Sequence, residues 1–526
     1  MKATDVLVKC LENEGVEYIF GIIGKETLDL IDSLSRSKQI QFINVRHEQG
    51  AAFMADVYGR LSHKAGVCLA TLGPGATNLL TGIASAALDH SPVIALIGQA
   101  GFERQHKESH QFLEIIKVFE PVTKWSVQVK DSQTIAEIIH KAFRVTKMEK
   151  LGPVLIELPE NLAAQMIPDN AMPTSSIQKL VPMFEAIQQT ISLIDQASRP
   201  FVIIGNGVMR GSAENELRIF IEKLQAPVTH SFKAKGILSK NHPQNFYTFG
   251  FKEKDEVLRG IDEANLLIVI GFDFVEKLPK EWNKKKIPII HIAAVHAESD
   301  EYYPVKMELV GDVKQTFQVL NKLEVLPKQW APSGNLQEQM KGLYQIHEGI
   351  DDSLSLISIL HMIEKKAFDE TIVISDVGAH KVTIARTYQP KQPNQLIMSN
   401  GLATMGIALP GAIGAKLARP DAPIICITGD GGVLMNFAEI ETATRLGLSF
   451  IIIILNNSKL KLEEEMMMKT FKNRYGTAFG NPDFVKLADS FHIKGLRPTN
   501  ISEFEKMLTD AQMQNELTLI EIQLES

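Results

Sequence analysis

The feature that most constrains the fold is a series of short runs rich in Ile, Val and Leu, each followed by a turn and a segment of helical period. Continuous apolar runs of this length indicate strands buried on both faces, as in parallel sheets covered by helices. The alternation therefore predicts an α/β protein. The strand candidates are residues 41–45, 66–71, 93–97, 154–158, 201–204, 266–270, 287–292, 371–375, 424–428 and 450–455.

The length of 526 residues is too great for one hydrophobic core and suggests about three domains. Two stretches, residues 163–176 and 326–343, interrupt the alternation with prolines and small polar residues, which is typical of interdomain linkers. We therefore expect three Rossmann-like or flavodoxin-like parallel-sheet domains. Their predicted bounds are residues 1–165, 180–325 and 350–526.

Charge and composition exclude several classes of partner. A net charge of −7 argues against a surface that binds nucleic acid or an anionic membrane. No apolar run approaches the roughly 20 residues of a membrane helix, and the first residues predict an amphipathic helix rather than a signal peptide. The three cysteines have no metal-ligand spacing, and Cys68 and Cys426 lie within apolar runs. Buried, reduced thiols of this kind indicate a cytoplasmic protein.

A glycine-rich turn follows the predicted strand at 424–428. It reads Gly429-Asp430-Gly431-Gly432, and a helix is expected to begin near Asn436. Glycines allow backbone N–H groups to approach phosphate oxygens closely, and a helix N-terminus adds a favourable dipole. The next strand, 450–455, ends at Asn456-Asn457. Because the two strand ends of a right-handed βαβ unit lie at one edge of the sheet, Asp430 and Asn457 are predicted to converge.

A carboxylate and a side-chain amide are oxygen ligands of the kind that Mg²⁺ prefers, with phosphates completing its shell. The backbone carbonyl of Lys459 is a plausible third protein ligand. A Gly-Asp-Gly sequence alone is more often a simple turn. Its pairing with the asparagines at the next strand end predicts a site for Mg²⁺ and a diphosphate.

These segments resemble the cofactor signature of thiamine-diphosphate-dependent enzymes. The resemblance implies that Asp430, Asn457 and the Lys459 carbonyl hold Mg²⁺. A second turn, Gly378-Ala379-His380, matches another diphosphate-contacting segment of the family. The residues implied to bind the diphosphate end of the cofactor are Gly378, Ala379, His380, Gly429, Asp430, Gly431, Gly432, Asn457, Lys459 and Leu460.

The segment from Arg46 to Gly50, with Glu48 at its centre, looks like the amino-terminal signature of the acetolactate synthase branch. The resemblance implies that Glu48 is catalytic. Its carboxyl group would be held against N1′ of the aminopyrimidine and favour the imino tautomer, which takes the proton from C2 of the thiazolium. Without that context, a glutamate at a helix start is usually a surface residue or a partner of the helix dipole.

Two further loops resemble segments that hold the pyrimidine. The turn from Thr71 to Asn78 is similar to the family's Gly-Pro-Gly turn and implies contacts from Gly73 and Asn78, although Asn78 could equally cap a helix. The loop that contains Ala403 and Met405 resembles the one that bends the cofactor. The Ala403 carbonyl and the Met405 N–H would contact the pyrimidine, with the Met405 side chain wedged beneath it. Taken alone, Met405 would be assigned to the core.

The resemblance also implies an assembly. Glu48 lies in the first predicted domain and the diphosphate site in the third. In this family these parts come from different subunits, so the chain is expected to form a homodimer or homotetramer with active sites at subunit interfaces.

Several motifs narrow the comparison to the catabolic, flavin-independent acetolactate synthases. The segment 152–160 closes the first domain as in that group, and His110-Gln111 implies that Gln111 faces the substrate, pyruvate. Where flavin-containing relatives usually show Arg-Phe-Asp-Asp-Arg, this chain has residues 273–277, Asp-Phe-Val-Glu-Lys, so no functional FAD is expected. The turn 205–211 resembles part of a dinucleotide fingerprint but lacks its full spacing, and is interpreted as structural.

Two differences from the family's sequence pattern weaken the assignment of pyruvate as the substrate. Lys25 lies in Gly21-Ile22-Ile23-Gly24-Lys25-Glu26, where relatives commonly have Gly-Ile-Pro-Gly-Glu-Glu. Glu463 occupies a position where the family usually has a small apolar residue facing substrate. Its carboxylate would repel a 2-oxo acid unless Lys25 or Lys461 offset the charge. Alternatively, Glu463 faces solvent while Leu462 and Met466 pack inward.

The function expected from the resemblance is acetolactate synthase, a carboligase that decarboxylates pyruvate and joins the two-carbon unit to a second pyruvate. One alternative is another 2-oxo acid decarboxylase or carboligase that uses the same cofactor. A second is a relative that binds the cofactor but has lost turnover. The weakest, a nicotinamide oxidoreductase, depends only on the turn 205–211.

Overall fold

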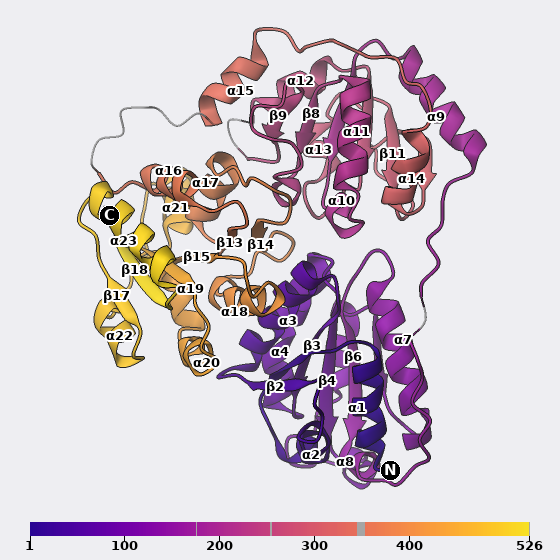
Figure 1. Cartoon of the computed structure of the whole chain (residues 1–526), viewed down its shortest axis with the longest axis vertical. Coiled ribbons are helices and arrows are strands. Elements are labelled where there is room, and N and C mark those ends of the chain that lie inside the picture. The colour runs from indigo at the N-terminus through magenta and orange to yellow at the C-terminus, as the bar shows by residue number, and fades with distance from the viewer. Residues whose placement is uncertain (175, 253–254, 345–352, 525–526) are drawn as a thin grey trace.

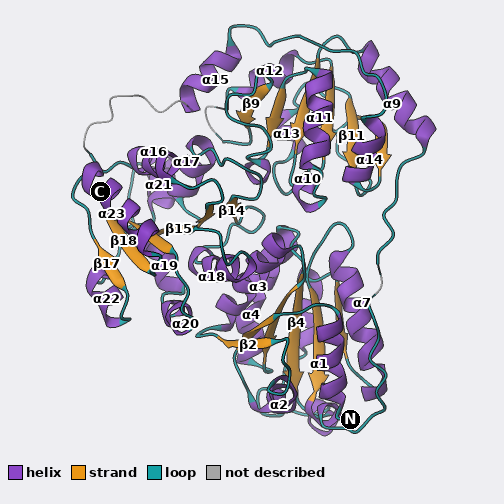
Figure 2. Cartoon of the chain, viewed as in Figure 1, coloured by secondary structure: helices purple, strands orange, loops and turns teal. Residues whose placement is uncertain are grey.

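The computed structural model describes residues 1–174, 176–252, 255–344 and 353–524. It contains three six-stranded sheets, and every strand pair in them is parallel. Figure 1 shows the sheets as three bodies in chain order, with the middle one above, the N-terminal one below and the C-terminal one at the side. Helices flank each sheet (Figure 2). The predicted α/β fold is confirmed, and each strand candidate corresponds to a strand.

The N-terminal sheet has the order β2-β1-β3-β4-β6-β5. Alternate residues of its central strands enter different hydrophobic clusters: Cys68 and Ala70 contribute to one, Val67 and Leu69 to the other. Burial on both faces explains why the strand is a continuous apolar run. The strands are β1 (Tyr18–Gly21), β2 (Gln41–Asn44), β3 (Gly66–Ala70), β4 (Val93–Gln99), β5 (Trp125–Gln128) and β6 (Val154–Pro159), and the helices are α1 (Ala3–Asn13), α2 (Leu28–Leu34), α3 (Glu48–Ser62), α4 (Pro74–Leu88), α5 (Phe102–Gln105), α6 (Ile115–Phe119), α7 (Ile135–Lys147) and α8 (Glu160–Ala163).

The middle sheet has the order β12-β11-β10-β7-β8-β9. The predicted linker at 326–343 is only partly irregular, because α15 lies in it and buries Leu336 and Met340 in the core of this sheet. The strands are β7 (Pro200–Ile204), β8 (Val228–His230), β9 (Asn245–Thr248), β10 (Leu266–Ile270), β11 (Ile289–Ala293) and β12 (Val305–Val310), and the helices are α9 (Phe184–Gln196), α10 (Gly207–Arg210), α11 (Glu214–Leu224), α12 (Val257–Glu263), α13 (Pro279–Trp282), α14 (Val313–Leu320) and α15 (Leu336–Tyr344).

The C-terminal sheet has the order β14-β13-β15-β16-β18-β17. The predicted start of this domain at residue 350 lies outside the described residues. The strands are β13 (Ile372–Ser375), β14 (Leu396–Met398), β15 (Ile424–Gly429), β16 (Ile451–Asn456), β17 (Lys494–Leu496) and β18 (Thr518–Gln523), and the helices are α16 (Leu356–Lys366), α17 (Ala379–Thr387), α18 (Ala408–Ala418), α19 (Asp430–Met435), α20 (Glu439–Arg445), α21 (Lys461–Phe471), α22 (Phe484–Ser490) and α23 (Ile501–Gln514).

The N-terminal and C-terminal domains share one hydrophobic cluster, formed largely where α3 packs on α18. The helices approach so closely that a Cβ on Gly414 would lie 2.3 Å from the Met54 carbonyl oxygen, so glycine permits this packing. The packing fixes the start of α3 relative to the C-terminal sheet. Within the described part of the chain, none of the helices combines the length and hydropathy that a membrane crossing needs.

Candidate active site

The ends of β15 and β16 bring Asp430 and Asn457 together. The strands pair in parallel with Gly429 opposite Leu455, so the residues that follow them lie at one edge of the sheet. The buried Asp430 carboxylate accepts hydrogen bonds through Oδ2 from the backbone N–H groups of Asn457, at 3.2 Å, and Ser458, at 2.6 Å.

The helix expected near Asn436 is α20, which begins at Glu439. The sequence did not indicate the short helix before it, α19, whose first residue is Asp430. Gly431 and Gly432 adopt helical backbone, and Asp430 Oδ1 accepts the Gly431 N–H at 3.0 Å. The glycine-rich turn is therefore the first turn of α19, where the Gly431 N–H is held by Asp430 and the following N–H groups lack partners within the helix.

Asn481 joins this group, although nothing in the sequence pattern singled it out. Its Nδ2 donates to Asp430 Oδ2 at 2.8 Å and to Asn456 Oδ1 at 2.9 Å. The segment before it runs beside Leu460, whose N–H donates to the Thr477 carbonyl at 2.8 Å. Lys459 is the residue before Leu460, and its Nζ pairs with Glu464 at 3.1 Å.

His380 lies beside this turn, on α17, directly after the N-cap Gly378 and the first helical residue Ala379. A Cβ on Gly429 would lie 3.4 Å from the His380 ring. Burial lowers the pKa of His380 to about 4, so the imidazole is neutral near pH 7. Among the described residues its buried Nε2 has no hydrogen-bond partner.

Other buried polar atoms around the turn also lack partners among the described residues: Thr404 Oγ1, Asn436 Oδ1 and Asn481 Oδ1. Buried polar groups without partners are costly unless a ligand satisfies them. The Thr404 hydroxyl can donate to a phosphate oxygen, whereas the two amide oxygens are acceptors and suit a cation or a hydrogen-bond donor.

The donor set also decides which metal fits. Among the residues that the structure describes, no three His, Cys, Asp or Glu side chains form a metal cluster. A cation here would depend on one carboxylate, an amide, backbone carbonyls and the oxygens of a ligand. This all-oxygen set suits Mg²⁺ bound together with phosphates.

A loop from residue 399 to 406 carries Ala403 and Met405. A Cβ on Gly431 would lie 3.7 Å from Met405 Cε, so the methionine reaches toward the glycine-rich turn. Ala403 has a φ of 54°, which costs energy for a residue with a side chain and marks a constrained loop.

The buried carboxylate of Asp376 holds the far end of this loop. It accepts the Gly406 N–H at 2.8 Å and the Thr428 hydroxyl at 2.9 Å. Burial raises the pKa of Asp376 to about 6. One side chain thus ties the loop to the strand that leads into the glycine-rich turn.

Glu48 is the first residue of α3, after the N-cap His47, and its side chain is buried. Its Oε2 accepts a hydrogen bond from Asn78 Nδ2 at 2.9 Å. Asn78 lies inside α4 and Gly73 is the N-cap, so the alternative that Asn78 caps the helix is wrong. No hydrogen bond among the described residues joins Glu48 to the Asp430 group.

Gly73 fits its place because its φ is 59° and a Cβ there would lie 2.8 Å from the Gln111 carbonyl oxygen. Gln111 itself is exposed and lies against this turn. The structure thus places Gln111 beside the N-terminus of α4.

Glu439 is a second residue that sequence reasoning missed. From α20 of the C-terminal domain, its Oε1 accepts the backbone N–H groups of Arg46, at 3.1 Å, and His47, at 3.0 Å. Burial raises the pKa of Glu439. The start of the helix that carries Glu48 is therefore held by the C-terminal domain.

The two unusual charges, Lys25 and Glu463, have different surroundings. Lys25 Nζ is 4.0 Å from a carboxylate oxygen of Glu160. Glu463 is exposed on α21, as in the alternative that turns it to solvent, but Met466 is also 54% exposed, so the inward packing of Leu462 with Met466 in that alternative does not form in the single chain.

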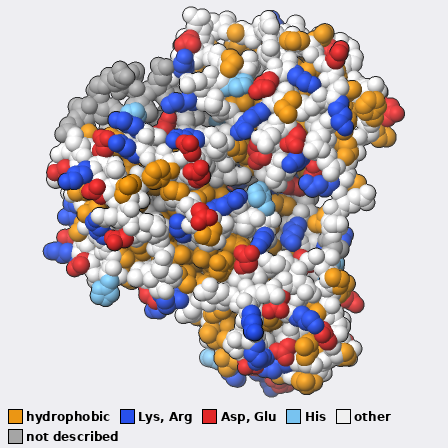
Figure 3. Space-filling model, in the orientation of Figure 1, with side chains coloured by type: hydrophobic (Ala, Val, Ile, Leu, Met, Phe, Trp, Pro, Cys, Tyr) orange, Lys and Arg blue, Asp and Glu red, His pale blue; other side chains and the backbone are white. Residues whose placement is uncertain are grey.

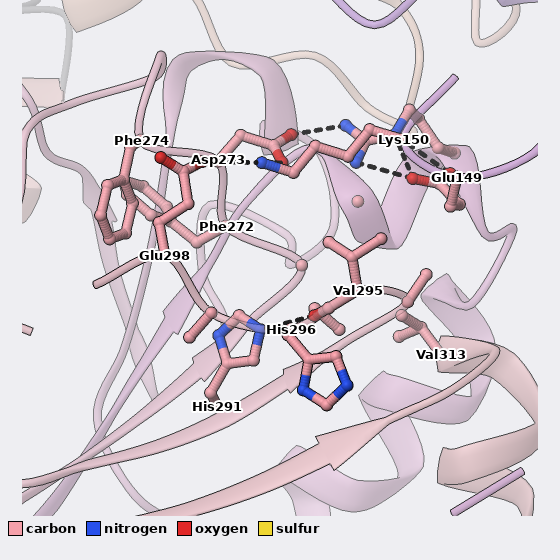
Figure 4. A pocket seen from close by; sticks show the side chains of 16 residues that line it. Glu149, Lys150, Phe272, Asp273, Phe274, His291, Val295, His296, Glu298 and Val313 are labelled. Atoms are coloured by element: carbon pink, nitrogen blue, oxygen red, sulfur yellow. Dashed lines mark hydrogen bonds and ion pairs between the residues drawn. The ribbon is translucent and has the colours of Figure 1, made fainter. Parts of the chain in front are cut away.

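The middle domain has a cavity of about 20 Å³ between β10, β11 and α10. Figure 4 shows Asp273, Glu149 and Lys150 among the side chains around it. Asp273 pairs with Arg210 at 2.6 Å and with Lys150 at 3.4 Å, and Arg210 also pairs with Glu149 at 3.0 Å. A space of this size holds about one water molecule.

The turn at 205–207 packs against the same strand end. A Cβ on Gly205 would lie 2.4 Å from Phe272 Cα, and one on Gly207 would lie 2.8 Å from Gly271 Cα. The glycines therefore serve close backbone packing, which matches the structural interpretation of this turn.

Comparison with known proteins finds three family models along the chain. Residues 1–118 match the thiamine pyrophosphate enzyme N-terminal TPP binding domain, residues 187–321 the central domain, and residues 376–522 the C-terminal TPP binding domain.

Similar curated proteins extend over nearly the whole length. An acetolactate synthase of Bacillus subtilis is 32% identical, covering 94% of this chain and 88% of the relative. A probable acetolactate synthase large subunit of Methanocaldococcus jannaschii is 32% identical, covering 99% and 92%. The acetolactate synthase isozyme 1 large subunit of Escherichia coli is 31% identical, covering 93% and 88%.

Proposed function

The chain belongs to the thiamine pyrophosphate enzymes, and on that premise we propose that it is an acetolactate synthase. It takes two molecules of pyruvate, releases one CO₂ and yields 2-acetolactate. The observation that carries the proposal is the match, across all three domains, to relatives that bear this name.

Two sets of residues in this chain hold the two ends of the cofactor, and the first set holds the pyrimidine. When bound, thiamine diphosphate supplies the nucleophilic carbon and takes up the negative charge left by the loss of CO₂. Glu48 holds the proton at N1′ of the pyrimidine, and Asn78 keeps the carboxylate in place. The Ala403 carbonyl, the Met405 N–H and Gly73 position the pyrimidine, and the Met405 side chain supports it from below. Gln111 orients pyruvate.

The diphosphate end is held by the other set of residues. The diphosphate would lie beside His380 and Gly431 and accept the N–H of Gly432. Asp430, Asn457 and the Lys459 carbonyl would hold Mg²⁺, which would supply positive charge to the diphosphate.

We propose that the active enzyme is a homodimer or homotetramer with the domains 1–165, 180–325 and 350–526. Hydrophobic side chains gather on the surface around α18, where the N-terminal and C-terminal domains meet (Figure 3). Apolar residues of α19 and α21 are also exposed in the single chain: Met435 at 56%, Met466 at 54% and Phe471 at 71%. A second subunit would cover such surface and complete the site with its own Glu48.

We propose that catalysis needs no FAD. Residues 273–277 differ from the Arg-Phe-Asp-Asp-Arg stretch that is usual in flavin-containing relatives, and Asp273 at this strand end is already paired with Arg210. Purified enzyme is expected to lack flavin absorbance, and added FAD is expected to leave activity unchanged.

We place the enzyme in the cytoplasm, in keeping with its three buried, free cysteines, and assign it no nucleic-acid or membrane partner.

The test is an assay of pyruvate consumption with and without thiamine diphosphate and Mg²⁺. The expected result is cofactor-dependent formation of 2-acetolactate, with one CO₂ for every two pyruvates. Absence of acetolactate, or a clear preference for another 2-oxo acid, would overturn the proposal.

A further inference from the structure

The carboxylate of Asp89 joins all three domains. This residue follows α4, and its side chain is fully buried. Arg60 of its own domain donates to Oδ2 at 3.0 Å. Lys233 of the middle domain donates to Oδ1 at 3.0 Å and to the Asp89 backbone carbonyl at 2.9 Å. The backbone N–H groups of Asn400 and Gly401, in the C-terminal domain, donate to Oδ1 at 3.2 and 3.0 Å.

Asn400 and Gly401 lie at the start of the loop that carries Ala403 and Met405. Gly401 sits so close to the end of α4 that a Cβ there would lie 2.5 Å from the Leu88 carbonyl oxygen. The Asn400 side chain is held in turn by Lys381 Nζ, 3.0 Å from Oδ1. With Asp376 fixing Gly406 at the other end, the loop is fastened on both sides of the residues that meet the cofactor.

The charges make this contact strong. Burial alone would raise the pKa of Asp89, but Lys233 and Arg60 hold it well below its usual range, so the carboxylate is ionised. The Lys233 side chain is only 7% exposed. Without Lys233, Arg60 would be the one remaining cation paired with Asp89 among the described residues, and losing part of a buried ion-pair group costs far more than losing a surface pair.

We propose that Asp89 is a positioning residue for the cofactor. Through Lys233, the position of the loop at 399–406 depends on the position of the middle domain. Lys233 fixes the carboxylate, the carboxylate fixes the N–H groups of Asn400 and Gly401, and the loop then presents Ala403 and Met405 in one conformation. The middle domain thereby gains a role in cofactor binding without touching the cofactor. This inference rests on the cofactor placement proposed above.

The experiment compares Lys233→Met with Lys240→Met by calorimetric titration of thiamine diphosphate into the full-length protein at saturating Mg²⁺. Lys240 is a matched control because it also reaches from the middle to the C-terminal domain, pairing with Glu364 at 2.8 Å, but away from the loop. Lys233→Met is expected to weaken cofactor binding roughly tenfold or more, as loss of an outer-shell partner does. Lys240→Met is expected to change it by less than about twofold.

Lys233→Arg keeps the charge and is expected to recover part of the lost affinity. Wild-type affinity in Lys233→Met, equal weakening in Lys240→Met, or no recovery in Lys233→Arg would each overturn the proposal. The titration contains no pyruvate, so its outcome is independent of which 2-oxo acid the enzyme uses.

Discussion

The side-chain amide of Asn78 donates a hydrogen bond to the carboxylate of Glu48, with 2.9 Å between Nδ2 and Oε2. The two residues lie on adjacent helices, α4 and α3, which pack so tightly that a Cβ on Gly82 would lie 2.4 Å from Ala52 Cβ. Rigid packing therefore sets the direction of the carboxylate before any ligand arrives. A fixed carboxylate of this kind suits proton transfer to a bound ring.

Replacement of Glu48 by Gln should abolish most activity while leaving the cofactor bound. Gln has nearly the same shape but does not hold or accept the proton at N1′. The rate of acetolactate formation is expected to fall by about 100-fold or more. Calorimetry should show thiamine diphosphate affinity within a few-fold of wild type. Activity that survives this substitution undiminished would place the catalytic acid elsewhere.

Asn78 should act through Glu48. Asn78→Ala removes the hydrogen bond and is expected to lower kcat by about tenfold, whereas Asn78→Asp sets two carboxylates together and should lower it further. Steady-state kinetics of the single variants and of Asn78→Ala combined with Glu48→Gln check this. Because the two residues act as a unit, the double variant should be little worse than Glu48→Gln alone. Fully additive losses would show that Asn78 has a separate function.

The sequence predicted those parts of the site that follow from a strand and the turn after it. Buried strands are continuous apolar runs, so the edges at which Asp430 and Asn457 meet could be located without a structure. Asn481 could not, because it reaches Asp430 from a segment 51 residues along the chain. Glu439 was missed for a related reason, since its contact with Arg46 and His47 forms only when two distant domains pack.

Asn481 should strengthen Mg²⁺ binding at the Asp430 site. Its amide donates to Asp430 Oδ2 at 2.8 Å and so helps to orient the carboxylate, whose Oδ1 accepts a single N–H and keeps a lone pair for a cation. Asn481→Ala is expected to raise the Mg²⁺ concentration for half-maximal activity by roughly 10-fold or more. The measurement is a Mg²⁺ titration of enzyme first stripped with EDTA.

A matched control is Asn473→Ala, because Asn473 is exposed after α21. This variant should retain the wild-type Mg²⁺ requirement. If both variants shift equally, the effect lies in the segment as a whole rather than in the contact with Asp430.

Acid should destabilise the middle domain through His230. Burial lowers the pKa of this side chain from 6.5 to about 3, with Lys235 contributing second, and His230 is only 1% exposed. Because the folded pKa lies below the unfolded one, the unfolded chain takes up the proton first. The stability contributed by neutral His230 is therefore complete above pH 6.5 and is lost progressively as pH falls toward 3, by about 1.4 kcal/mol per pH unit at most. Calorimetric melting temperatures between these pH values should fall less steeply in His230→Gln than in wild type, whatever the variant's stability at neutral pH. Parallel slopes for the two proteins would show that another group controls acid unfolding.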